Sequence, residues 1–117
     1  MGEYVYECVP EGVWNAVYVG VVEAEIPSRK FEGKKEKVLR HLFDADVSGR
    51  IVRIDCLSDL RPSPFNRFGK IFRVFEGRDI RPQESAPVEK WAGRKAVVVV
   101  ETRNGRSVVA NILPPKE

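Results

Sequence analysis

The stretch that decides the fold covers residues 63–77 and reads SPFNRFGKIFRVFEG. Its apolar residues recur at spacings of three and four, at Phe65, Phe68, Ile71, Phe72 and Phe75. This period is typical of one face of an α-helix of about three turns. Ser63 can cap the start of the helix with Pro64 in its first position, and Gly77 can end it. We predict that this helix plugs a hydrophobic core, because apolar positions at helical spacing are more often core than ligand site.

Three strands are expected before this helix. Residues 13–24 are rich in valine, and Gly20 lies in their middle, where a strand can bend or bulge. Residues 37–47 and 50–57 each place apolar side chains on one face by strict alternation. Ser48-Gly49 between them indicates a tight turn, so these two segments are expected to form a hairpin.

Two more strands are expected after the helix, over residues 94–103 and 106–113. Asn104-Gly105 lies between them and strongly predicts a hairpin turn, because both residues tolerate positive φ. The expected order along the chain is therefore three strands, one helix and two strands. A five-stranded barrel with its helix between the third and fourth strands is the arrangement of the OB-fold.

We therefore predict an all-β fold with a single OB-like domain over residues 1–117, whose barrel covers about 12–114. An SH3-like barrel and an open β-sandwich are the alternatives, and the position of the helix favours the OB-fold. Residues 1–11 contain Tyr4, Tyr6 and Cys8 in alternation. We expect this segment to add an extra strand or arm, or to pair with another subunit.

The net charge is only +3, but the charges are sorted along the chain. Residues 1–27 carry five acidic and no basic residues, whereas residues 28–40 carry six basic and two acidic ones. Residues 50–81 carry eight basic and four acidic residues. Sorted charge of this kind indicates a basic surface that binds a polyanion, with a merely solvated surface as the alternative.

The expected binding residues lie where an OB-fold grips a strand, which is on two of its loops and on the face of strands two and three. Lysine and arginine neutralise phosphates there, and aromatic rings stack on bases. The candidates are Arg29, Lys30, Phe31, Lys34, Lys35 and Lys37 in the first loop, Arg40 and Arg53 on the strands, Trp91, and Arg103 and Arg106 in the second loop. For both aromatic residues, a position covering an end of the barrel is the alternative.

The residues do not point to an enzyme. His41, the only histidine, is expected on the apolar face of a strand, where a structural histidine is more common than a general base. Asp44 and Asp46 share one strand face and could hold Mg²⁺, but two solvated carboxylates at a strand end are the simpler interpretation. We expect no cofactor, no metal and no small-molecule substrate.

Cys8 and Cys56 are the only cysteines and lie in apolar surroundings. Two buried thiols are the favoured interpretation, with a disulfide left open. The longest apolar run, residues 96–100, is too short to span a membrane, and no secretory signal is visible at the start. We expect a cytoplasmic protein.

Several short motifs follow one another in the order found in a known group of proteins. They are Glu11-Gly12-Val13-Trp14, then Gly33, Lys34, Leu39 and Phe43, then the helix that ends in Phe75 and Gly77, then Gly93-Arg94-Lys95, and last Asn111, Ile112 and Pro114. On these motifs, residues 12–114 resemble the small OB-fold proteins of phage replication modules, which are similar to single-stranded DNA-binding proteins. The resemblance implies a protein that oligomerises and protects or presents single strands during replication or recombination.

These observations lead to one functional expectation and one alternative. We expect binding of single-stranded DNA or RNA without strong sequence preference, by a monomer or a homo-oligomer. The alternative is a protein-interaction or structural module of a viral or mobile-element assembly, whose basic loops contact an acidic partner.

Overall fold

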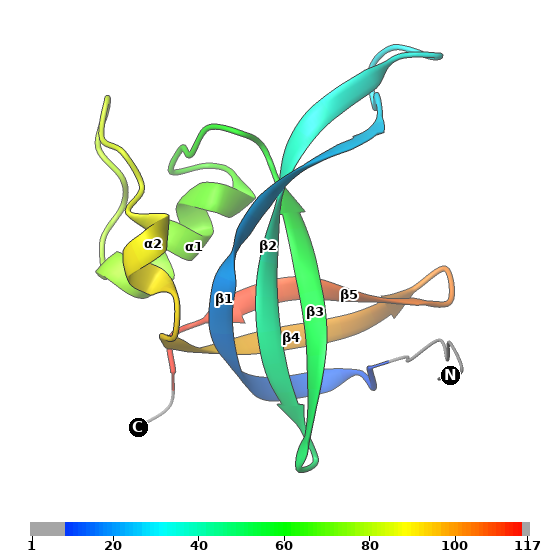
Figure 1. Ribbon diagram of the computed structural model, residues 1–117, viewed down its shortest axis with the longest axis vertical. Helices are drawn as coiled ribbons and strands as arrows, with labels where there is room; N and C mark the ends of the chain where they lie inside the picture. Colours follow the sequence, from blue (N-terminus) through cyan, green and yellow to red (C-terminus); the bar gives the residue numbers. More distant parts are fainter. Residues whose placement is uncertain (1–8, 116–117) are drawn as a thin grey trace, which may run out of the picture.

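The computed structural model describes residues 9–115, which form one antiparallel sheet and two helices (Figure 1). The strands lie across the sheet in the order β3-β2-β1-β4-β5. Their bounds are Gly12–Pro27 for β1, Lys35–Val47 for β2, Arg50–Ser58 for β3, Lys95–Arg103 for β4 and Arg106–Leu113 for β5. Helix α1 covers Arg67–Glu76 and the short helix α2 covers Val88–Trp91, both between β3 and β4 in the chain. The five antiparallel strands confirm the all-β prediction.

Strand β1 is the centre of the sheet, because it pairs on both of its edges. It pairs with β4 only from Gly12 to Val17, but with β2 from Asn15 to Pro27. Its register against β2 shifts between Tyr18 and Gly20, and Gly20 has a φ of +157°. Such a bulge bends a strand and increases its twist. The predicted bend at Gly20 is therefore confirmed, and β1 leaves β4 just before it.

The two tight turns that the sequence predicts are both present. Ser48 and Gly49 join β2 to β3 with φ values of 54° and 87°. Asn104 and Gly105 join β4 to β5 with φ values of 51° and 74°. Two consecutive positive φ angles match the right-handed twist of the flanking strands, which fixes the register of each hairpin.

The sheet is open between its two edge strands. β3 and β5 approach each other, with Cα atoms within 8 Å, but within residues 9–115 the sheet contains no ladder that joins them. Helices α1 and α2 lie together on one side of the molecule, away from the turn between β4 and β5 (Figure 1). The fold is thus a curled five-stranded sheet with helical cover on one side.

The core is built around Trp91, whose side chain is 0% exposed. Its ring meets those of Tyr18 and Phe72 edge-on, with ring centroids 5.9 Å away in both cases. Its indole nitrogen donates a hydrogen bond of 2.9 Å to a carboxylate oxygen of Glu76. Trp91 therefore ties α2 to α1 and to the central strand. The buried face of α1, with Phe68, Ile71, Phe72 and Phe75, confirms that this helix fills the core.

Helix α1 starts later than the sequence suggested. Asn66, not Ser63, is its N-cap, and the Asn66 side-chain oxygen accepts hydrogen bonds from the backbone nitrogens of Gly69 at 3.0 Å and Ser63 at 3.1 Å. The turn before the helix packs directly on Gly69, where a Cβ would lie 1.6 Å from the Ser63 carbonyl oxygen. Phe65 consequently precedes the helix and is 96% exposed. Its predicted place on the buried helical face was wrong.

The contrast between Phe72 and Phe65 yields a prediction for stability. Phe72→Ala removes a fully buried ring and should lower the free energy of unfolding by about 3–5 kcal/mol. Phe65→Ala, the matched control, should change it by less than about 0.5 kcal/mol, because the ring is exposed. Chemical denaturation followed by circular dichroism measures both. Similar losses for the two variants would contradict the packing of α1.

Candidate functional site

The hairpin of β1 and β2 extends beyond the rest of the sheet as a two-stranded ribbon (Figure 1). β1 has no partner in β4 after Val17, and β2 pairs with β3 only from Leu39 onward. We call residues 21–38, which carry the end of this hairpin, the β1–β2 finger. At its tip, residues 29–35 are all exposed to solvent.

The tip of the finger is an ordered turn. The Ser28 backbone nitrogen donates to the Lys34 carbonyl oxygen at 2.7 Å. The Ser28 hydroxyl accepts from the backbone nitrogens of Lys30 at 3.2 Å and Phe31 at 3.0 Å. Gly33 takes a φ of +77°, which closes the turn at little steric cost. The tip therefore presents its side chains from a defined backbone.

The tip carries four exposed lysines and one exposed aromatic ring. Residues 28–37 carry five basic and two acidic residues, for a net charge of +3. Lys30, Lys34, Lys35 and Lys37 are exposed and form no ion pair with any carboxylate of residues 9–115. Phe31 is 63% exposed, and the Lys34 ammonium lies 5.7 Å from its ring centroid. An aromatic face among free ammonium groups can hold both a base and its phosphates.

Arg29 has a different role from these lysines. Its guanidinium lies 2.6 Å from a carboxylate oxygen of Glu36 and 3.4 Å from one of Asp59. The hydrogen bond from Arg29 holds the pKa of Glu36 below its usual range. Asp59 follows directly after β3, so Arg29 braces the tip of the finger against the end of that strand. This predicted phosphate ligand is already paired.

The outer face of β2 and β3 is balanced in charge. The Arg53 guanidinium contacts both carboxylate oxygens of Asp44, at 2.5 and 3.3 Å. Arg40 lies 3.0 Å from a carboxylate oxygen of Asp55. Each of these two predicted ligands therefore shares its charge with a neighbouring carboxylate. Both pairs depend on the register between β2 and β3, which no local sequence pattern reveals. Asp46 accepts from the Gly49 nitrogen at 2.8 Å, so Asp44 and Asp46 both have protein partners.

The turn between β4 and β5 supplies a second, weaker cationic site. Arg103 pairs with Glu101 at 2.8 Å, whereas Arg106 is exposed and forms no ion pair with a carboxylate of residues 9–115. The tip of the β1–β2 finger and the turn at Gly105 project toward the same side of the view in Figure 1. They form two separate projections (Figure 1).

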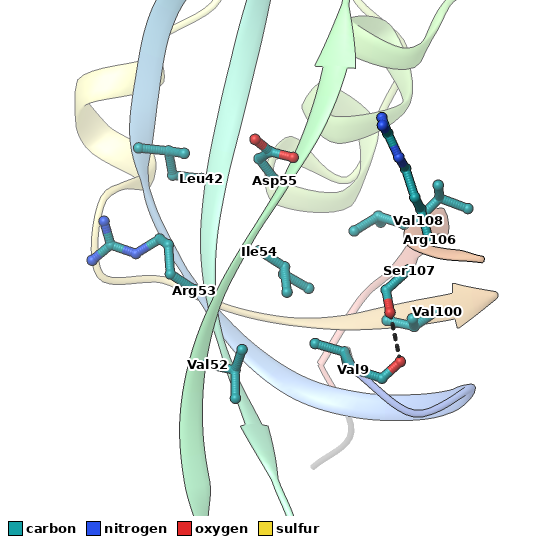
Figure 2. A pocket seen from close by; sticks show the side chains of 11 residues that line it. Val9, Leu42, Val52, Arg53, Ile54, Asp55, Val100, Arg106, Ser107 and Val108 are labelled. Carbon is teal, nitrogen blue, oxygen red and sulfur yellow. Dashed lines mark hydrogen bonds between the residues drawn. The ribbon is translucent and has the colours of Figure 1, made fainter. Parts of the chain in front are cut away.

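A hollow of about 460 Å³ lies at the open seam between β3 and β5 (Figure 2). Figure 2 shows Val9, Ile54 and Val108 on its mainly apolar wall, and the Ser107 hydroxyl donates to the Val9 carbonyl oxygen at 2.8 Å. The expected arm over residues 1–11 is described only from Val9 onward. No local motif in the sequence predicts this hollow, because it arises from the curl of the whole sheet.

Trp91 does not belong to a surface site. Its ring is fully buried between Tyr18, Phe72 and Phe75 and offers no face to a base. Its burial within the core corrects the expectation of a stacking role and supports the alternative of a covering position. Of the two aromatic candidates, only Phe31 is exposed.

His41 is part of a buried polar chain. The Ser58 hydroxyl donates its one proton to the Asp59 carbonyl at 2.9 Å, so it accepts from the His41 Nε2 at 2.8 Å. In the neutral ring this leaves Nδ1 to accept from the Tyr18 hydroxyl at 2.9 Å. This chain requires the neutral ring, and burial lowers the pKa of His41 to about 4. His41 is therefore the structural histidine that the sequence analysis favoured.

Cys56 is a buried free thiol whose pKa burial raises to about 12, whereas Cys8 lies outside the described residues. Residues 9–115 contain no cluster of three side chains that could hold a metal ion. Nor is any helix in that range long and apolar enough to cross a membrane. Comparison of the chain with protein-family models, curated proteins and solved structures finds no match.

The burial of neutral His41 predicts how stability changes with pH. Its folded pKa of about 4 lies below the ordinary value of 6.5, so the unfolded state binds a proton first as the pH falls. The contribution of neutral His41 to the free energy of unfolding is nearly complete at pH 7 and should fall by about 2 kcal/mol between pH 7 and 5. Denaturant unfolding at several pH values measures this. His41→Gln should flatten the profile, and an equal slope in that variant would show that another group causes it.

Proposed function

We propose that the protein binds single-stranded nucleic acid without strong sequence preference, and that the β1–β2 finger is the main contact. The observation that carries this proposal is the exposed Phe31 among unpaired lysines on an ordered tip. The strand order β3-β2-β1-β4-β5, the approach of β5 to β3 and the position of α1 support an OB-like arrangement that remains open.

The chemistry of the tip explains why binding would be unspecific. Ammonium groups on flexible chains neutralise phosphates and release counterions, which depends on charge and not on base identity. A phenylalanine ring stacks on any base, because every base has a π face. Stacking of this kind needs an unstacked base, so a single strand fits better than a duplex.

The paired arginines contribute little to this interface. Arg29, Arg40, Arg53 and Arg103 each already contact a carboxylate. Of the predicted ligands, those that remain for phosphates are the tip lysines and Arg106. The strand would then pass from the finger toward the β4–β5 turn, on the side where both project (Figure 1).

The seam between β3 and β5 favours a second candidate function. Open strand edges beside an apolar hollow can accept an extended segment of another protein. A protein-interaction module of a viral or mobile-element assembly would use this surface and would not need the finger lysines.

A titration with labelled oligo-dT at several salt concentrations tests the first proposal. Neutralising several phosphates should give a log–log slope of about three to five in magnitude. Absence of binding at low salt, or an affinity that does not change with salt concentration, would contradict the nucleic-acid proposal and favour the protein-interaction module.

Variants at the tip separate charge from stacking. Lys34→Ala with Lys35→Ala should weaken binding and lower the slope by up to about two, the number of lost phosphate contacts. Phe31→Ala should weaken binding by about 1–3 kcal/mol with little change of slope. The matched control is Lys90→Ala with Lys95→Ala, which removes the same charge from exposed positions at α2 and at the start of β4. Equal effects of both lysine pairs would mean that only general positive charge matters.

A further inference from the structure

Phe65 lies on a different part of the surface from the finger. Its side chain is 96% exposed, more than any other large apolar side chain of residues 9–115. It directly precedes α1 in the chain. In Figure 1, α1 lies on the side of the view opposite to the finger tip and the β4–β5 turn. A ligand at Phe65 would therefore leave the finger accessible.

The backbone that carries Phe65 is held firmly. Its own backbone nitrogen donates to the Ser63 hydroxyl at 3.1 Å, and the Asn66 side-chain nitrogen donates to the Arg61 carbonyl oxygen at 2.9 Å. The same turn packs on the backbone of Gly69 without room for a Cβ. An exposed ring on a fixed turn loses little backbone freedom on binding, so the conformational entropy cost of a contact at Phe65 is small.

Two apolar hollows flank the ring. One, of about 610 Å³, is lined by Pro62, Ile80 and Pro82, and the other, of about 530 Å³, by Val74, Leu113 and Pro114. Pro64 and Phe65 line both hollows, so the apolar surface is continuous across them. Proline and aliphatic walls suit apolar side chains of a peptide better than they suit the flat faces of bases.

The rim of this surface is positive. Arg61 and Arg81 line the first hollow and Lys70 lines the second, all exposed and without an ion pair to a carboxylate of residues 9–115. The two acids that line these hollows are both paired with arginines: Glu84 accepts hydrogen bonds from Arg78, which lower its pKa to about 2, and Asp79 lies 3.5 Å from Arg73. Charge complementarity therefore favours an acidic partner.

We propose that the Phe65 surface docks an acidic segment of a partner protein that carries at least two large apolar side chains. These side chains fill the hollows on either side of the ring. The carboxylates of the segment meet Arg61, Arg81 and Lys70. This interaction goes beyond nucleic-acid binding and lets the protein hold a strand and a partner at once.

Selection from a displayed random-peptide library tests this surface. The wild-type protein serves as the target and Phe65→Ser as the counter-target, a change that should leave folding intact because the ring is exposed. Enriched peptides should combine Asp or Glu with large apolar residues. A synthetic peptide of an enriched sequence should bind Phe65→Ser roughly tenfold more weakly than wild type. Arg61→Glu with Lys70→Glu should weaken it as well.

Phe31→Ser is the matched control, because it removes the other exposed phenylalanine and should leave peptide affinity unchanged. Failure to enrich any peptide, enrichment of basic peptides, or equal affinity for wild type and Phe65→Ser would overturn the proposal. A loss of oligo-dT binding in Phe65→Ser would also overturn it, since the occupant would then be nucleic acid. Loss of oligo-dT binding in Phe31→Ser alone bears on the finger and not on this surface.

Discussion

The unequal pairing of β1 on its two edges is the constraint on which the structure depends. β4 covers β1 only up to Val17, while β2 follows it to Pro27. The bulge at Gly20 bends β1, so that its first part lies in the core of the sheet and its last part forms the hairpin with β2 alone. The basic tip therefore lies on the part of the hairpin that extends beyond the pairing with β4.

The core beneath the bulge is closed by one aromatic cluster. Trp91 joins α2, α1 and β1, and Tyr18 extends the cluster into the polar chain through His41 to Ser58. Every polar side-chain atom of that chain has a hydrogen-bond partner, so burying these groups destabilises the fold little. The interior side chains are thus packed or hydrogen-bonded to one another, and the side chains that can bind a ligand lie on the surface.

Local features of the sequence predicted much of this fold. Two positive φ angles at Asn104-Gly105, the left-handed cap at Gly77 and strict alternation in β2 and β3 act over a few residues, so they are visible in the chain. The start of α1 was misplaced because Asn66 and Ser63 compete as caps, and the packing of the turn on Gly69 decides between them.

The candidate site was less accessible to prediction, because it depends on long-range partners. Lysines at the tip were identified correctly as exposed cations, but the pairing of Arg53 with Asp44 depends on the register between β2 and β3. The burial of Trp91 depends on three elements that are distant in the chain. The seam between β3 and β5 follows from the curl of the whole sheet.

Backbone amide shifts in NMR spectra, followed while oligo-dT is added, test the central role of the finger most directly. We expect the largest changes within residues 28–37, smaller ones near Arg106, and almost none on the outer face of β2 and β3. Changes centred on that outer face or on α1, or no changes at all, would contradict binding through the β1–β2 finger.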